Sequence, residues 1–312
     1  MPPHAPAIFL ACFCWSAWNA AAYAEEVSVP VDYQSRQIQL AGRFEKPPGP
    51  GPFPVVILLH NCAGIDGSPS LAVWAQLMWA QGYATLRLDS FTARGYSNVC
   101  ANLQVRPAER AQDVFAAAYM LAARPDVRPD RIAALGVSHG AATAIYVARD
   151  YGELHPWRER LAAWHGRLVA SVALYGGCRG NPDRPVIAPL LALLGGRDDW
   201  APAAPCVALA NGQPNGIMQA VIYPDAYHSF DAAGGYRETP QRLRPRARIQ
   251  PRSNRGCAQA SCRISLTISA IIRDAVLQQS PSSRSSDGVG LSNGPLSEPL
   301  TMRRRCSRIL RP

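Results

Sequence analysis

The chain of 312 residues has a single lysine, Lys46, and no apolar run long enough to form a membrane-spanning helix. We attribute the scarcity of lysine to coding bias, because nothing around Lys46 indicates a site. The longest run of small and apolar residues, Ala5–Ala22, is shorter than the roughly 20 residues that a span requires. We therefore expect no membrane span in the mature protein.

The N-terminal run has instead the character of an export signal. It ends in Ala22-Tyr23-Ala24, a small-residue pattern typical of signal-peptide cleavage, directly before two glutamates. The sequence therefore predicts a signal peptide over residues 1–24 and an exported, periplasmic or secreted, protein. The residues before the run depart from the usual pattern, since His4 and the α-amine are the only candidate positive charges, and an uncleaved anchor is the alternative.

The positive charge of the chain is confined to its C-terminal part. Residues 241–312 contain fourteen arginines and three acidic residues, so this segment has a net charge of +11, whereas the net charge of the whole chain is +10. The remaining residues carry a net charge of −1, so the body shows no bias toward nucleic acid or an anionic membrane. The segment 241–312 is rich in Arg, Ser and Pro and predicts a largely disordered tail, with Ile264–Leu277 as one amphipathic stretch. An out-of-frame coding segment would give the same composition.

Four cysteines remain once the signal and the tail are set aside, and they have no zinc-ligand spacing. A metal site is therefore not expected. In an oxidising compartment an even number of cysteines indicates disulfides, with three alternative pairings for four residues. We favour Cys178 with Cys206, because each follows a predicted strand on one sheet edge, and hence Cys62 with Cys100. Four free buried thiols are the alternative.

The body alternates short apolar runs with helix-period segments and contains no evident repeat. Such alternation predicts an α/β fold with a mostly parallel central sheet and helices on both faces, in a domain over residues 25–240. An antiparallel edge hairpin is expected between Glu26 and Pro48. The predicted strands are Val55–Leu59, Ala84–Leu88, Ile132–Leu135, Val169–Leu174, Leu190–Leu194 and Ala220–Tyr223, and the predicted helices are Leu71–Gln81, Ala108–Ala123, Ala141–Tyr151 and Pro202–Ala210.

The strongest functional signal is a Gly-x-Ser-x-Gly pattern centred on Ser138. It lies between the apolar strand ending at Leu135 and a helix rich in small residues. A nucleophilic serine in this pattern sits on a sharp turn between a strand and a helix, so this context fits the role. The flanking glycines, Gly136 and Gly140, let strand and helix approach closely. We interpret Ser138 as a nucleophile; an ordinary structural turn is the alternative.

A serine hydroxyl needs a positioned imidazole and a carboxylate, which follow it in the chain in this class of fold. Asp198 and Asp199 lie just past the end of the predicted strand Leu190–Leu194, and His228 comes after the strand ending at Tyr223. The carboxyl ends of parallel strands meet at one sheet edge, so these side chains are expected near Ser138. We favour Asp198 as the acid and His228 as the base, with a turn aspartate and a surface histidine as the alternatives.

Two backbone N–H groups are candidates for binding the oxyanion. His139 follows the serine at a helix N-terminus, where the helix dipole favours negative charge. The second donor is expected from the loop after Val55–Leu59, with Cys62 favoured and Asn61 the runner-up. His60 in the same loop is expected to orient it rather than to act as a base.

Several motifs of the body occur together in one known family. They are His60-Asn61-Cys62-Ala63-Gly64, Asp89-Ser90-Phe91 with Arg94-Gly95, the turn at Ser138, Tyr175-Gly176-Gly177-Cys178, the segment from Gly195 to Trp200 and the segment from Tyr223 to Asp231. From about Val27 to Asp231 the chain resembles the dienelactone hydrolase family, particularly its exported, cysteine-containing members. The resemblance implies an α/β-hydrolase fold, no cofactor, and hydrolysis of a small-molecule ester or lactone through an acyl-enzyme. It also implies that Asp198 and His228 belong to a triad and that Cys62 is an oxyanion donor.

Two departures from the founding members of that family, in the site residues and in the tail, limit what the resemblance implies. They have a cysteine nucleophile and a glutamate after the first buried strand, where Ser138 and Asn61 stand here, so lactone specificity is not implied. They hold a substrate carboxylate with arginine, for which Arg94 is a candidate although its register is shifted by one residue; a solvated loop arginine is the alternative. The family also closes its sheet with a helix after the histidine, for which Ile264–Leu277 is a candidate; a chain without that helix is the alternative.

Two other functions are compatible with the sequence. A catalytically inactive member of the fold would bind ligands without turning them over, and a basic adaptor would act through the arginines between Arg242 and Arg311. Neither alternative needs serine, acid and histidine in this order along one sheet edge. We therefore favour the serine hydrolase.

Overall fold

The computed structural model describes residues 23–178 and 184–231. Most of the predicted signal peptide, the domain boundary at residue 240, the tail and the expected helix Ile264–Leu277 lie outside the described residues. The predicted cleavage point after Ala24 falls two residues inside the first strand. In the described part of the chain, no helix combines the length and the apolar character needed to cross a bilayer.

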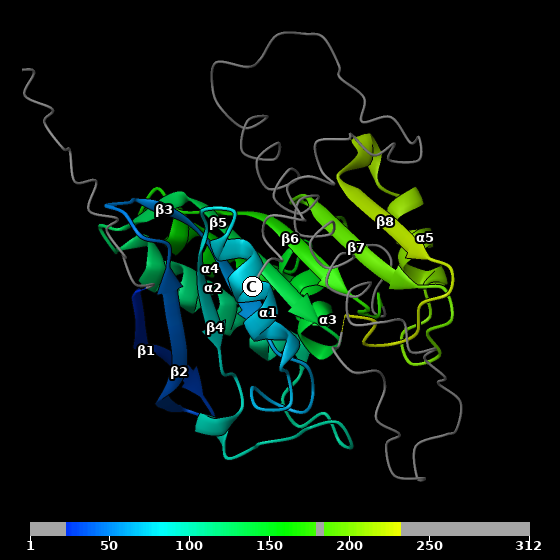
Figure 1. Ribbon diagram of the computed structural model, residues 1–312, viewed down its shortest axis with the longest axis horizontal. Coiled ribbons are helices and arrows are strands. Elements are labelled where there is room, and N and C mark those ends of the chain that lie inside the picture. The colour runs from blue at the N-terminus through cyan, green and yellow to red at the C-terminus, as the bar shows by residue number, and fades with distance from the viewer. Residues whose placement is uncertain (1–22, 179–183, 232–312) are drawn as a thin grey trace, which may run out of the picture.

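One eight-stranded sheet forms the centre of the molecule (Figure 1), with the strand order β1-β2-β4-β3-β5-β6-β7-β8. β1 and β2 form the antiparallel hairpin expected from the sequence, and β2 pairs antiparallel with β4. All other pairs are parallel. The strands are β1 (Tyr23–Tyr33), β2 (Arg36–Lys46), β3 (Phe53–Leu59), β4 (Ala84–Leu88), β5 (Val127–Val137), β6 (Leu168–Leu174), β7 (Leu190–Gly195) and β8 (Met218–Tyr223).

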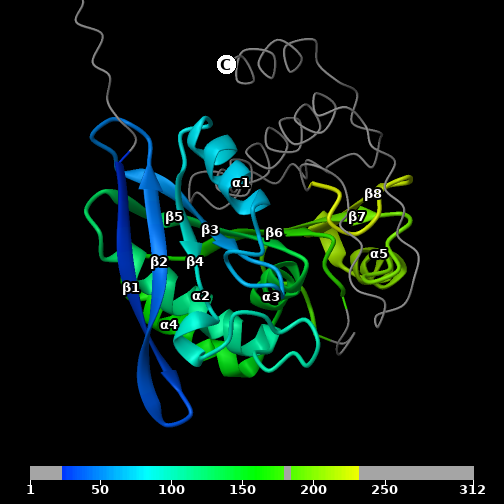
Figure 2. The ribbon, with the colours of Figure 1, turned by 60° about the horizontal axis from the view of Figure 1, so that its bottom comes forward.

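Helices cover both faces of the sheet (Figure 2), which confirms the predicted fold class. One face carries α1, and the other carries α2, α3 and α4, with α5 packed beside β8. The helices are α1 (Ser70–Trp79), α2 (Pro107–Ala122), α3 (His139–Val147), α4 (His155–Ala162) and α5 (Ala204–Asn211), and three short 3-10 helices span Thr92–Arg94, Gly152–Leu154 and Pro214–Gly216.

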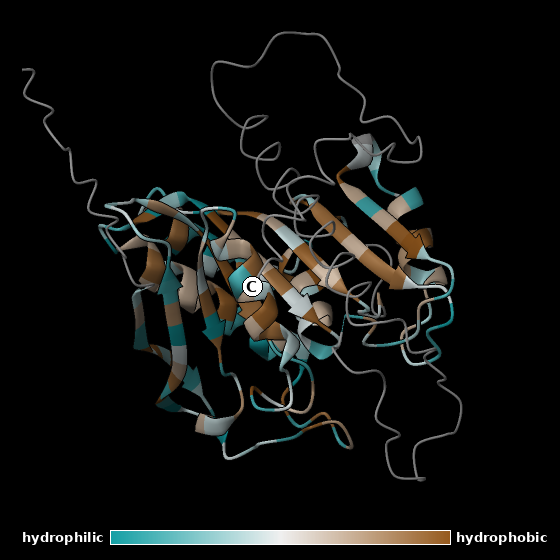
Figure 3. Cartoon of the chain, viewed as in Figure 1, coloured by the Kyte–Doolittle hydropathy of each residue, from teal (hydrophilic) through white to brown (hydrophobic). Residues whose placement is uncertain are grey.

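The continuous apolar runs of the central strands are explained by burial on both faces (Figure 3). Alternate residues of β3 enter different cores: Val56 and Leu58 pack with α1, whereas Ile57 packs with α2. β5 begins earlier than its apolar run, because Val127 pairs with Phe53 before the register shifts and regular pairing resumes at Ile132. The regular part of the sheet is thus the part that both layers bury.

Two disulfides join loops to this framework. One links Cys62 to Cys100 and the other links Cys178 to Cys206, which are the pairs favoured above. The first ties the loop after β3 to the segment that follows β4. The second ties the loop after β6 to α5. Both bonds therefore constrain loops at the sheet edge where the parallel strands end.

We expect reduction to lower the free energy of unfolding. The Cys178–Cys206 bond closes a loop with a sequence separation of 28 residues, and the chain-entropy account assigns about 3 to 4 kcal/mol to a loop of that size. Urea unfolding with and without reductant measures the change. In the Cys178→Ser/Cys206→Ser variant, Cys62–Cys100 is the disulfide that remains within the described residues, so an undiminished effect of reductant in that variant would contradict the prediction.

Candidate active site

Three predicted site residues follow three different parallel strands. Ser138 comes directly after β5, Asp198 lies three residues after the end of β7, and His228 lies in the loop after β8. Because β5 to β8 run in the same direction, these loops share one edge of the sheet. The topology therefore brings together residues that are 90 positions apart in the chain.

The turn at Ser138 is strained and closely packed. Ser138 has φ 52° and ψ −112°, a conformation that L residues rarely adopt. A Cβ on Gly136 would lie 2.0 Å from the Gly140 oxygen, and one on Gly140 would lie 2.2 Å from the Leu59 oxygen. Both glycines are therefore required by direct backbone contact among β5, α3 and β3.

The side chains of the three residues form a continuous hydrogen-bonded chain. Ser138 Oγ lies 2.8 Å from His228 Nε2, and His228 Nδ1 lies 2.8 Å from Asp198 Oδ2. With the imidazole proton on Nδ1, His228 donates to the carboxylate and accepts from the serine hydroxyl. This is the geometry in which an imidazole can accept a proton from a serine.

The structure distinguishes Asp198 from its neighbour Asp199. The Asp198 side chain is fully buried, and its second oxygen, Oδ1, accepts hydrogen bonds from the backbone N–H groups of Trp200 and Ala201, both at 2.9 Å. Asp199 is exposed. Asp198 is thus the aspartate held in a fixed orientation against His228.

The two expected oxyanion donors lie in segments that contact each other. His139 N–H is the first amide of α3, and Cys62 lies in the turn after β3. Within the described residues, neither amide is engaged by a hydrogen-bond acceptor. Among the described residues, both amides therefore remain without an acceptor.

The loop of Cys62 is ordered by its own polar groups. Asn61 Oδ1 accepts from Ala63 N–H at 2.7 Å, and Asn61 N–H donates to Ser68 Oγ at 2.9 Å. His60 is fully buried, with Nδ1 2.8 Å from the Asn61 oxygen and Nε2 accepting from Ser90 N–H. Burial, and then the charge of Arg110, hold the pKa of His60 well below its usual range. His60 therefore orients the loop as a neutral side chain.

His228 is held between two aromatic side chains. The Trp200 ring stacks on the imidazole with centroids 5.4 Å apart, and the Tyr175 ring meets it edge-on at 5.0 Å. Trp200 is 37% exposed, so one part of its indole faces solvent beside the imidazole. These contacts restrict the plane of the imidazole ring.

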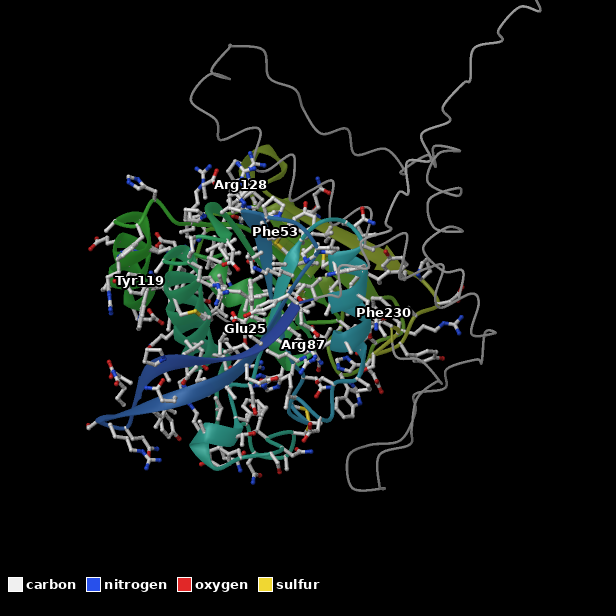
Figure 4. The ribbon with its side chains drawn as sticks, turned by 60° about the vertical axis from the view of Figure 1, so that its left-hand side comes forward. Glu25, Phe53, Arg87, Tyr119, Arg128 and Phe230 are labelled. Carbon is white, nitrogen blue, oxygen red and sulfur yellow. A yellow bond between two sulfur atoms is a disulfide. The ribbon has the colours of Figure 1, made fainter. Side chains whose placement is uncertain are left out.

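The loop of His228 is anchored three residues further on by Asp231. Its carboxylate accepts hydrogen bonds from Tyr175 Oη at 2.6 Å and from Trp74 Nε1 at 2.8 Å. Burial raises the pKa of Asp231, and the two hydrogen bonds oppose that rise. Phe230, labelled in Figure 4, packs between the loop and the core that contains α1. The loop is therefore fastened to the core on the α1 side of the sheet, opposite the side that α2 covers.

The substrate-binding role expected for Arg94 is wrong in this structure. Its guanidinium forms a buried, bidentate ion pair with Asp113, at 2.7 and 2.9 Å, and also donates to the Ser90 oxygen. Only 2% of the Arg94 side chain is exposed. Because Asp113 satisfies both terminal nitrogens, Arg94 serves the packing of α2 and is not available to a substrate carboxylate.

Asp231 and Arg110 were not identified from the sequence as contributors to the site. Asp231 closes the last motif quoted above, three residues after His228, and this proximity was the only signal. Arg110 lies on the buried face of α2, where it and Asp113 are charged residues within a mainly apolar pattern, and that interruption is the signal. It contacts the ring of His139 and the backbone of His60.

No group of three or more His, Cys, Asp or Glu side chains within residues 23–178 and 184–231 is placed to hold a metal ion.

The sequence profile of the dienelactone hydrolase family matches residues 40–242, about two-thirds of the chain. The chain belongs to the dienelactone hydrolase family. As a member, it is a hydrolase that acts on ester bonds, and its substrate is a small molecule. No curated protein sequence matches this dienelactone hydrolase family member at a significant level.

Solved structures agree on the fold. A dienelactone hydrolase-like promiscuous phosphotriesterase from metagenomic libraries is 19% identical over 79% of this chain and 98% of its own, with a TM-score of 0.57. A 2,6-dihydroxy-pseudo-oxynicotine hydrolase is 16% identical over 81% of this chain and 68% of its own, with a TM-score of 0.55. A Klebsiella pneumoniae protein assigned as a dienelactone hydrolase is 22% identical over 68% and 89%, with a TM-score of 0.52.

Removing the Asp231 carboxylate should release the His228 loop. In Asp231→Ala, Trp74 Nε1 and Tyr175 Oη lose their acceptor, which should cost about 2 kcal/mol or more in the free energy of unfolding. Displacement of His228 should lower kcat by about 10-fold or more. Urea unfolding and ester hydrolysis measure the two effects. Asp225→Ala is the matched control, because Asp225 lies in the same loop but pairs with Arg197 at the surface; equal effects of the two substitutions would refute the anchoring role.

Proposed function

We propose that this hydrolase is a serine esterase, which cleaves small-molecule esters or lactones through an acyl-enzyme on Ser138. The observation that carries the proposal is the pair of 2.8 Å contacts that link Ser138 Oγ, His228 and Asp198. The strained turn and the buried carboxylate support it, because both hold reactive groups in a fixed arrangement.

In the first half of the reaction, Ser138 Oγ attacks the acyl carbon while His228 Nε2 accepts the hydroxyl proton. The tetrahedral intermediate collapses when the bond to the leaving oxygen breaks, and His228 returns its proton to that oxygen. The products of this half are a free alcohol and an ester of Ser138. Asp198 stabilises the cationic imidazole and fixes its tautomer.

In the second half, a water molecule takes the place of the alcohol. His228 removes a proton from the water, the resulting hydroxide attacks the acyl carbon, and Ser138 leaves with the proton from His228. The released product is the carboxylic acid. In both halves the oxyanion is bound by two backbone N–H groups, that of Cys62 in the disulfide-linked loop and that of His139 at the N-terminus of α3.

We also propose that the protein is exported, with residues 1–24 as a signal peptide and residues 25–240 as the hydrolase domain. The two disulfides support this, because such bonds persist in oxidising compartments.

Loss of the nucleophile should remove the activity. We expect Ser138→Ala to lower kcat on short p-nitrophenyl esters by about 10⁴-fold or more, as in enzymes that rely on a serine triad. Ser28→Ala is the matched control, because Ser28 is an exposed serine on β1, and it should hydrolyse at the wild-type rate. Initial rates on a panel of esters and lactones provide the measurement, and equal rates for Ser138→Ala and wild type would remove the proposal.

A further inference from the structure

Arg110 is a charged residue for which the mechanism above has no use. It lies on α2, its exposure is 0%, and its Nη1 donates to the His60 oxygen at 2.9 Å and to His139 Nδ1 at 2.7 Å. The acceptor role of Nδ1 places the proton of His139 on Nε2. One guanidinium nitrogen therefore joins the loop after β3 to the first residue of α3.

These two segments carry the proposed oxyanion donors. His60 lies two residues before Cys62, and His139 supplies its own amide. The segments already touch through their backbones, because a Cβ on Gly140 would lie 2.7 Å from the His60 oxygen. The bridge through Arg110 thus lies at the contact between the two segments, and this contact determines the distance between the two donor amides.

The bridge is made by a charge that the fold buries at a cost. Burial lowers the pKa of Arg110 to about 9, so that the guanidinium is cationic at neutral pH. Its Nε and Nη2 atoms have no hydrogen-bond partner among the described residues, and the Phe91 ring lies 5.0 Å from its Cζ. Asp113 gives its two oxygens to Arg94. An apolar side chain of similar length would avoid the cost of leaving buried donors unpaired.

We propose that Arg110 is a positioning residue for the oxyanion site. It fixes the separation of the Cys62 and His139 amides and holds a positive charge behind them, where negative charge develops in the transition state. It neither contacts the substrate nor exchanges a proton with it. The inference rests on the proposed serine-esterase function, and the experiment below separates the failure of one from the failure of the other.

The role predicts a defect in the transition state rather than in substrate binding. Arg110→Met retains the length of the side chain without its charge and hydrogen bonds, and we expect kcat to fall by about 30- to 100-fold with little change in KM, near the loss of one oxyanion donor. Arg110→Lys retains the charge and one donor. The kcat of Arg110→Lys should fall only about 3- to 10-fold, and this variant tests the same point if Arg110→Met does not fold.

The experiment measures kcat and KM per active site, with the concentration of active sites in each variant determined by titrating a separate aliquot to completion with a fluorophosphonate. The affinity of a trifluoromethyl ketone, which forms a tetrahedral oxyanion on a nucleophilic serine, is measured in parallel. For a residue that positions the oxyanion site, this affinity and kcat/KM should fall together across wild type, lysine and methionine. A residue that only packs the core would lower the fraction of active protein and leave both quantities unchanged.

Arg94→Met is the matched control, because it also removes a buried arginine, whose hydrogen bonds go to Ser90 and Asp113 and to neither donor segment. It should lose stability and keep its kcat per active site. An unchanged kcat in both Arg110 variants, a rise in KM alone, or an equal loss of kcat in Arg94→Met would overturn the inference. Activity that survives Ser138→Ala would instead refute the proposed function on which the inference depends.

Discussion

The arrangement of the whole site depends on a backbone contact that leaves no room for side chains. At the end of β5 the chain turns into α3 within one residue, and Gly136 and Gly140 let it lie directly against the end of β3. The contact fixes Ser138 at a positive φ, a conformation that typically costs 1 to 3 kcal/mol. Ser138 keeps this strained backbone conformation because packing of the surrounding sheet and helix outweighs the residue's own preference for a negative φ.

The other groups of the site are held in place by separate bonds. A disulfide holds the loop of Cys62, and two backbone N–H groups hold the Asp198 carboxylate. Asp231 fastens the loop of His228 to Trp74 and Tyr175, which belong to the core between the sheet and α1. Loops are usually the mobile part of an α/β sheet. Here each loop of the site is held by a disulfide or by specific hydrogen bonds.

The sequence was sufficient for those features that follow from local pattern and topology. Continuous apolar runs gave the parallel strands, and the position of Ser138 between a strand and a helix gave the turn. Asp198 and His228 followed from the rule that parallel strands end at one edge. The dienelactone hydrolase family was recognisable from motifs distributed along the same loops.

What the sequence could not supply depended on pairing between distant charges. Arg94 has the residue type expected of a carboxylate-binding side chain and lies in a suitable loop. Its guanidinium, however, is already paired with Asp113 on α2 and is not free to bind a second carboxylate. The partners of Arg110 and Asp231 are likewise remote in sequence, at separations of 50 and 157 residues for two of their bonds. Sequence pattern reports which residues are buried and not which polar groups meet there.

The central claim is that Ser138 becomes covalently acylated during turnover. It is tested most directly by mixing the enzyme with p-nitrophenyl acetate, quenching in acid within the steady state, and mapping the digested protein by mass spectrometry. The account predicts one acetyl group on the peptide that contains Ser138, and none on that peptide in a His228→Ala variant. Continued hydrolysis with an acetyl group on another residue, or with no acetyl group on any peptide, would contradict it.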